Sequence, residues 1–225
     1  MRKTFIIGHF NIKSIILLFF ILIYYQNVQA SNLAVGFLGQ LALTGANTNS
    51  SKIFPSKFED FDGGFIASLG YKKYITSSIS SSILIDLGYY RDIHNFNYCI
   101  GDKKFIEKYN FNNFLIGGHL RVGFDFFSIG AGAGIKIPIT ATFKVNDSSY
   151  DFKFKDLNDM FEVPIIPYVK ISFDFLILKS MLIGLYASYN FPYKFKQNVC
   201  YTKYYVNKKQ ISSVDIGIQF GFVDF

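Results

Sequence analysis

The stretch FLIGGHLRVGF, residues 114–124, alternates between two kinds of side chain. Large apolar residues recur at every second position, with Gly118 as the one interruption, and the positions between them include glycines, His119 and Arg121. Because successive side chains of a β-strand point to opposite faces, the alternation predicts a strand with one apolar face. Its length matches the roughly 9–11 residues of a strand that crosses a bilayer at a tilt.

Seven further stretches repeat this alternation. Together the predicted strands cover residues 33–43, 61–71, 79–89, 114–124, 127–143, 161–173, 181–191 and 214–222. The connections are alternately long and short, and the long ones are 44–60, 92–112, 144–160 and 192–212. An antiparallel meander would bring the long loops to one rim and the short turns to the other, as in bacterial outer-membrane barrels. The sequence therefore predicts an all-β fold: an eight-stranded antiparallel up-and-down transmembrane β-barrel over residues 31–225, with four extracellular loops.

The composition of the two strand faces indicates which one points outward. A soluble barrel such as a lipocalin would turn its apolar face inward and cover the outside with charged residues. Here the polar face consists of glycine, serine, threonine and scattered charges, and every strand carries phenylalanine or isoleucine on the other face. We therefore expect the apolar face to contact lipid and the small residues to fill a narrow interior.

Charged residues of both signs fall on the face that is predicted to point inward. Buried charges must be paired or hydrated, so we predict a network that fills the interior and leaves no wide pore. A narrow wet path remains an alternative. The expected network residues are Asp62, Asp86, His119, Arg121, Lys136, Glu162, Lys170 and Asp215.

The first 30 residues precede the strand pattern and resemble a secretory signal peptide. Basic residues come before an apolar run at 15–25, and Ala30 ends a segment suited to cleavage before Ser31. We predict a signal peptide over residues 1–30, Sec-type export and a location in the bacterial outer membrane; an uncleaved anchor helix is the alternative. Residues 1–30 hold three basic and no acidic residues, so their removal lowers the net charge from +7 to +4.

The two cysteines, Cys99 and Cys200, lie in the second and fourth predicted long loops. Both loops belong to the same rim, in a compartment that permits disulfides. A bridge between them would close a loop of about a hundred residues. Two unpaired thiols are the alternative.

Few residues suggest chemistry. The glycines at 130–134 resemble a phosphate-binding loop, but the strand pattern continues through them, which favours a packing role. His119 could act as a general base with Ser128 on the neighbouring predicted strand, although no catalytic motif surrounds either residue. We therefore expect no enzyme activity, no cofactor and no metal site.

The fourth predicted loop is rich in lysine and tyrosine. Residues 192–210 contain no acidic residue, and such a segment could bind lipid phosphates, anionic glycans or host surfaces. A merely solvated loop is the alternative, and nucleic acid is excluded as a partner outside the cell. The candidate contact residues are Lys194, Lys196, Lys203, Lys208 and Lys209.

Three segments carry a resemblance to a known family: DGGFIASLGY at residues 62–71, IGAGAG at 129–134 and DIGIQFGF at 215–222. With them the whole chain from residue 31 resembles the opacity-type outer-membrane β-barrels, which include surface antigens of Anaplasma, Ehrlichia and Wolbachia. The resemblance implies surface exposure, adhesion or antigenicity, and no catalysis. Family members usually end on a lipid-facing aromatic residue, whereas Phe225 is out of phase with the last predicted strand.

These expectations converge on a monomeric surface protein that acts through its loops, most directly in adhesion. Its expected partners are outer-membrane lipid, the secretion and barrel-assembly machinery and host surface molecules. A narrow passive porin or structural anchor is the first alternative, and a lipid-modifying enzyme is the second.

Overall fold

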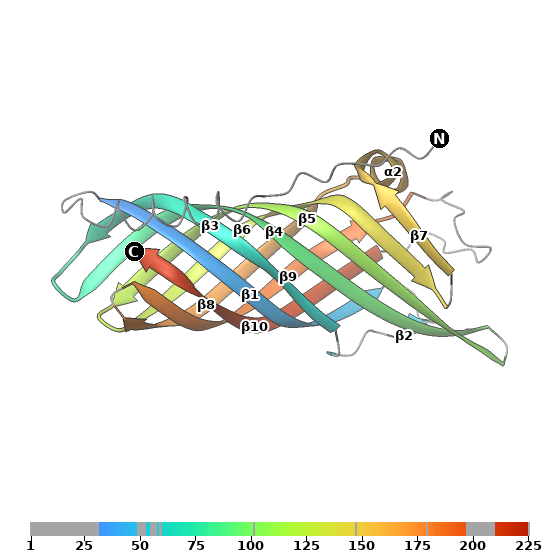
Figure 1. Cartoon of the computed structure of the whole chain (residues 1–225), viewed down its shortest axis with the longest axis horizontal. Coiled ribbons are helices and arrows are strands. Elements are labelled where there is room, and N and C mark those ends of the chain that lie inside the picture. Colours follow the sequence, from blue (N-terminus) through green and yellow to red (C-terminus); the bar gives the residue numbers. More distant parts are fainter. Residues whose placement is uncertain are drawn as a thin grey trace, which may run out of the picture. The chain divides into compact units, whose positions relative to one another are not determined.

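The computed structural model describes residues 32–48, 53–54, 58, 60–100, 102–146, 148–178, 180–196 and 210–224. Residues from Leu33 onward form one compact unit. Its elements, labelled as in Figure 1, are β1 (Leu33–Thr48), β2 (Ile53–Phe54), β3 (Asp60–Tyr74), β4 (Ile79–Ile100), β5 (Lys103–Phe124), β6 (Phe127–Val145), β7 (Ser148–Lys153), α2 (Phe154–Met160), β8 (Ile166–Leu178), β9 (Met181–Lys194) and β10 (Gln210–Asp224). The predicted signal peptide lies outside the described residues.

The long strands pair in the order of the chain and close into a barrel (Figure 1). Every pairing is antiparallel, and the ring is completed where β1 pairs with β10 from Val35↔Asp224 to Thr48↔Ile211. Among the described residues the ring holds eight strands, namely β1, β3, β4, β5, β6, β8, β9 and β10. The predicted eight-stranded antiparallel up-and-down barrel is therefore confirmed.

Short turns join the strands at one rim. Residues 75–78 connect β3 to β4, and Asp125 and Phe126 connect β5 to β6. The amide of Asp125, which has a positive φ of 36°, donates to the carbonyl of Ser78 at 3.0 Å and so links the two turns. Aspartate tolerates this left-handed conformation better than most residues.

The opposite rim is more regular than the sequence indicated. Residues 92–112 were expected to form a loop, but β4 and β5 continue in register as far as Ile100↔Lys103. The outward face of this segment carries asparagines and lysines, which are typical of loops. Its inward side chains, among them Asp92, Phe96 and Phe111, are buried in the barrel, so both strands continue in the sheet. Residues 144–160, also predicted as a loop, contain β7 and the helix α2.

The sixth strand of the barrel, β8, begins later than predicted. The expected strand covered residues 161–173, but β8 starts at Ile166, and Phe161 makes only an isolated bridge to Phe195. Pro164, which has no backbone N–H to donate, lies in the bend between this bridge and the first residue of β8.

The two faces of the barrel differ as predicted. Outward residues such as Phe65, Ile85 and Leu185 are exposed on an apolar outer surface, which we call the apolar belt. Inward residues are buried, and the charged network lies among them. In the part of the chain that the structure describes, no helix is long and apolar enough to cross a membrane.

Candidate functional sites in the barrel interior

The interior is filled at the long-loop rim by a hydrophobic cluster, which we call the aromatic cap. The ring centres of Tyr109 and Phe143 lie 4.7 Å apart, and those of Phe161 and Phe195 lie 4.5 Å apart. The helix α2 contributes Leu157, which is 0% exposed. The described members are Ala46, Phe96, Tyr109, Phe111, Ala141, Phe143, Phe152, Leu157, Met160, Phe161, Ile166, Tyr193, Phe195 and Ile211.

Below the cap lies a carboxylate–lysine cluster, formed by Asp62, Asp92, Asp215 and Lys136. Oxygen atoms of the three carboxylates lie within 4.8 Å of one another. The Lys136 ammonium is 2.7 Å from Asp92 Oδ1 and 3.4 Å from Asp215 Oδ2. The three carboxylates are close enough to share a cation, and Lys136 places its own ammonium among them.

Neutral donors complete the carboxylate–lysine cluster. Asn113 donates to Asp92 at 2.7 Å, and Asn190 donates to Asp215 at 3.0 Å. The hydroxyl of Thr44 lies within hydrogen-bond distance of Asp62 and Asp215. Carboxylates from three strands are thereby held together by side chains of β1, β5, β6 and β9, so the cluster joins strands on all sides of the barrel.

A second group of charges, the arginine cluster, lies closer to the short-turn rim. Arg121 Nη2 is 2.9 Å from Asp174 Oδ2, and Asp174 also accepts from Gln219 at 2.6 Å. Asp86 lies 3.8 Å from both Lys170 Nζ and His119 Nδ1 and accepts from a serine hydroxyl. A cavity of about 10 Å³ adjoins Lys136 and Lys170, which is room for about one water molecule.

The structure places most of the expected network residues in these two clusters. Asp62, Lys136 and Asp215 belong to the first, and Asp86, His119, Arg121 and Lys170 to the second. Glu162 is the exception, because it is exposed in the bend between α2 and β8.

Three buried acids were missed by the sequence reasoning: Asp92, Asp174 and Glu107. The alternation itself could have found them. Asp92 follows Asp86 and Tyr90 in phase along β4, and Asp174 follows Lys170 in phase along β8. Asp92 and Asp174 are the first residues of predicted connections and Glu107 lies within one, so the predicted network includes none of the three.

His119 and Ser128 do not form a catalytic pair. In the register of β5 and β6, His119 lies opposite Gly132, whereas Ser128 lies opposite Gly123. Four residues of a strand separate these positions by about 13 Å. The glycines at 130–134 are part of β6, which confirms their packing role.

The other candidates lie at the long-loop rim. Lys194 ends β9 and is exposed, and Lys196 donates to the backbone carbonyl of Asn158 at 3.1 Å. Lys203, Lys208, Lys209 and Cys200 lie outside the described residues. The backbone of Cys99 is part of β4, and its bridge to Cys200 stays a prediction.

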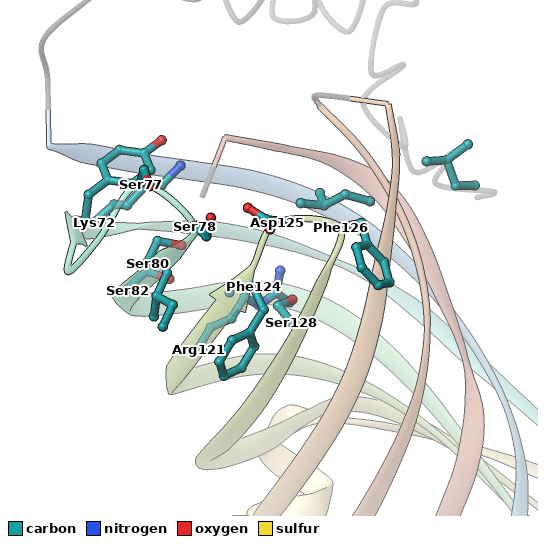
Figure 2. A pocket seen from close by; sticks show the side chains of 15 residues that line it. Lys72, Ser77, Ser78, Ser80, Ser82, Arg121, Phe124, Asp125, Phe126 and Ser128 are labelled. Atoms are coloured by element: carbon teal, nitrogen blue, oxygen red, sulfur yellow. The ribbon is translucent and has the colours of Figure 1, made fainter.

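At the short-turn rim the barrel opens into a pocket of about 580 Å³, which we call the vestibule (Figure 2). Polar residues line one part of it, chiefly Lys72, Ser80, Ser82, Arg121 and Ser128. Phe124, Phe126 and Leu176 line another part. The interior therefore changes from an aromatic cap, through two charged clusters, to a water-accessible vestibule.

Comparisons with known proteins show only distant structural similarity. No protein-family model and no curated protein matches the chain. Ail, the attachment invasion locus protein of Yersinia pestis, solved in complex with the heparin analogue sucrose octasulfate, is 9% identical, with a TM-score of 0.43 over 86% of this chain and 99% of that one. OprG of Pseudomonas aeruginosa is 13% identical, with a TM-score of 0.40 over 86% and 96%. The outer membrane protease OmpT of Escherichia coli is 8% identical, with a TM-score of 0.41 over 87% and 97%. The chain is thus similar to outer-membrane barrels of differing roles, and the likeness assigns none of these roles to it.

Proposed function

We propose that the chain is a monomeric integral barrel of a bacterial outer membrane, exported through a signal peptide at residues 1–30, and that it binds surface partners through its long-loop rim. The apolar belt supports the membrane location. On β4 the belt covers residues 79–89, which span about 28 Å of height at roughly 3.3 Å per residue and a tilt of about 40°. This height is close to the apolar band of about 25 Å in outer-membrane barrels.

Above the belt the outer surface of the hairpin formed by β4 and β5 becomes polar. Tyr89 donates to Asn112 at 2.6 Å, and Arg91 donates to Asn110 at 2.9 Å. Asn112 in turn donates to Thr140 at 2.8 Å, which extends the polar surface to β6. Beyond the pair Arg91↔Asn112 each strand continues for nine more residues, or about 30 Å along the strands. We infer that this hairpin stands in water outside the membrane.

The filled interior is the observation that carries the proposed function. The aromatic cap and the two charged clusters occupy the barrel from the long-loop rim to the vestibule, which argues against an open route for solutes. What remains for function is the folded structure at the long-loop rim. The resemblance to opacity-type surface proteins and to surface antigens of Anaplasma, Ehrlichia and Wolbachia supports adhesion to host surface molecules as the role of this rim.

A trimmed hairpin tests the proposal. Replacing residues 97–106 by Asn-Gly leaves the pair Phe96↔Glu107 joined by a two-residue turn and retains the aromatic cap. We expect the trimmed protein to remain heat-modifiable on a gel and to lose binding to host cells or matrix. Trimmed protein that binds as well as the intact chain would remove the hairpin from the adhesion proposal.

We further propose that the protein neither conducts nor catalyses. Planar-bilayer recordings should show no discrete conductance, and regular single-channel steps would favour the porin alternative. Exchange of His119 for alanine should leave the lipid composition of the membrane unchanged, because Ser128, the nucleophile considered for it, lies four residues away along the ladder. A change in the acyl-chain or phosphate content of the membrane lipids in cells that carry this variant would favour the enzyme alternative.

A further inference from the structure

A row of polar side chains crosses three neighbouring strands in the vestibule (Figure 2). Lys72 of β3 lies opposite Ser82 of β4, and Ser82 lies opposite Arg121 of β5. Directly opposite residues of antiparallel strands have Cβ atoms about 4.5–5.5 Å apart. The hydroxyl of Ser82 is therefore placed between two basic side chains.

A second row lies next to the first, one step closer to the rim. It consists of Ser80, Gly123 and Ser128 on β4, β5 and β6. A Cβ atom at Gly123 would come within 2.7 Å of the Ser80 hydroxyl, so the glycine keeps this part of the vestibule open. None of the hydroxyls of Ser80, Ser82 and Ser128 has a hydrogen-bond partner among the described residues, and Ser82 and Ser128 are buried.

The charges around the two rows favour an anion. Lys72 and Arg121 bring two positive charges to the vestibule. The fully buried Asp174, which lies opposite Ser128 in the register, pairs with Arg121 at 2.9 Å. Among the described lining residues, Asp125 is the carboxylate, and its side chain is exposed in the turn at the rim.

We propose that the vestibule binds a phosphate-type oxyanion, which would lie between the Lys72 ammonium and the Arg121 guanidinium and accept hydrogen bonds from the serine hydroxyls. Charge-assisted hydrogen bonds of this kind are short and strong, and guanidinium groups match the geometry of phosphate oxygens.

The size of the vestibule indicates that the phosphate belongs to a larger molecule. A volume of about 580 Å³ lies in the range of small-molecule sites, about 300–1,000 Å³. Phe124, Phe126 and Leu176 offer an apolar wall beside the polar rows. A soluble phosphate ester and a phospholipid head group share this chemistry, and an experiment can distinguish them.

The test uses the full-length mature barrel, refolded in a nonionic detergent, and isothermal titration calorimetry with two probes. Inorganic phosphate reports the oxyanion site alone, and dihexanoyl phosphatidic acid adds an apolar portion. Tighter binding of the lipid would identify a lipid head group as the source, and equal or weaker binding would identify a soluble phosphate compound.

A matched pair of variants decides whether the vestibule is the site. Lys72→Gln removes the inward ammonium, whereas Lys73→Gln removes the adjacent ammonium on the exposed face of β3. We expect Lys72→Gln to weaken phosphate binding about tenfold and Lys73→Gln to leave it unchanged. Ser82→Ala should weaken it severalfold. Equal affinities in the two lysine variants, or no saturable binding of either probe by heat-modifiable protein, would overturn the proposal.

Discussion

Replacement of Lys136 by methionine tests the architecture of the barrel interior most directly. The Lys136 side chain is 2% exposed, and its ammonium lies 2.7 Å from Asp92, 3.4 Å from Asp215 and 4.1 Å from the centre of the Tyr90 ring. Methionine has nearly the same volume, so the substitution removes the charge and leaves little cavity. Three carboxylates would then lie within 4.8 Å of one another without a cation.

The expected cost follows from the geometry of the cluster. Removing one partner of a buried ion pair typically lowers the free energy of unfolding by about 3–5 kcal/mol. With a urea dependence of about 3 kcal/mol per molar, the midpoint of unfolding should fall by roughly 1–2 M. Adding Asp92→Asn to Lys136→Met should restore at least about 1 kcal/mol, because it removes one of the three repelling charges.

The chain contains no tryptophan, so unfolding is best followed by far-ultraviolet circular dichroism and by gel mobility of unheated samples. Lys73→Met is the control, since this lysine is exposed and its loss should change stability by no more than about 0.5 kcal/mol. If Lys136→Met unfolds at the same urea concentration as the unaltered protein, the Lys136 ammonium does not stabilise the three carboxylates, and the proposed carboxylate–lysine cluster is refuted.

Three further predictions concern other parts of the barrel. Asp174→Asn should destabilise the barrel by about 3 kcal/mol in urea titrations, because it breaks the ion pair with Arg121. Glu162→Gln, at an exposed position, should have no measurable effect, and equal unfolding midpoints for the two variants would contradict the assignment of the arginine cluster. Leu157→Ala should cost about 2–5 kcal/mol of local stability and speed protease cleavage next to α2, and an unchanged cleavage rate would show that the helix does not seal the aromatic cap. Ile85→Lys on the apolar belt should cost about 2–4 kcal/mol in lipid and reduce the fraction recovered in membranes, and full recovery would refute lipid contact at this position.

The barrel itself could be predicted because its signal is local. Period-two alternation shows at once which residues share a face, and alternating long and short connections indicate an up-and-down order. The burial of Asp86, Arg121, Lys136 and Lys170 followed from phase alone.

The partners of these charges could not be predicted, since they depend on register around the ring. Lys136 of β6 contacts Asp215 of β10, with β8 and β9 between them in the ring, and no feature of either sequence segment predicts that contact. Asp92 could not be placed because the polar outward face of the hairpin has the composition of a loop. Glu162 lies outside the barrel ladder because β8 begins only at Ile166.

The pairing of β1 with β10 has a consequence for how the protein folds. Val35 lies opposite Asp224, so the last seam of the barrel joins segments that are far apart in the sequence. Contacts of such long range cost the most loop-closure entropy and form slowly. Until β10 pairs with them, β1 and β9 each have an unpaired edge that can aggregate with other chains. Folding should therefore be slow and nearly all-or-none, with closure of this seam as its final step.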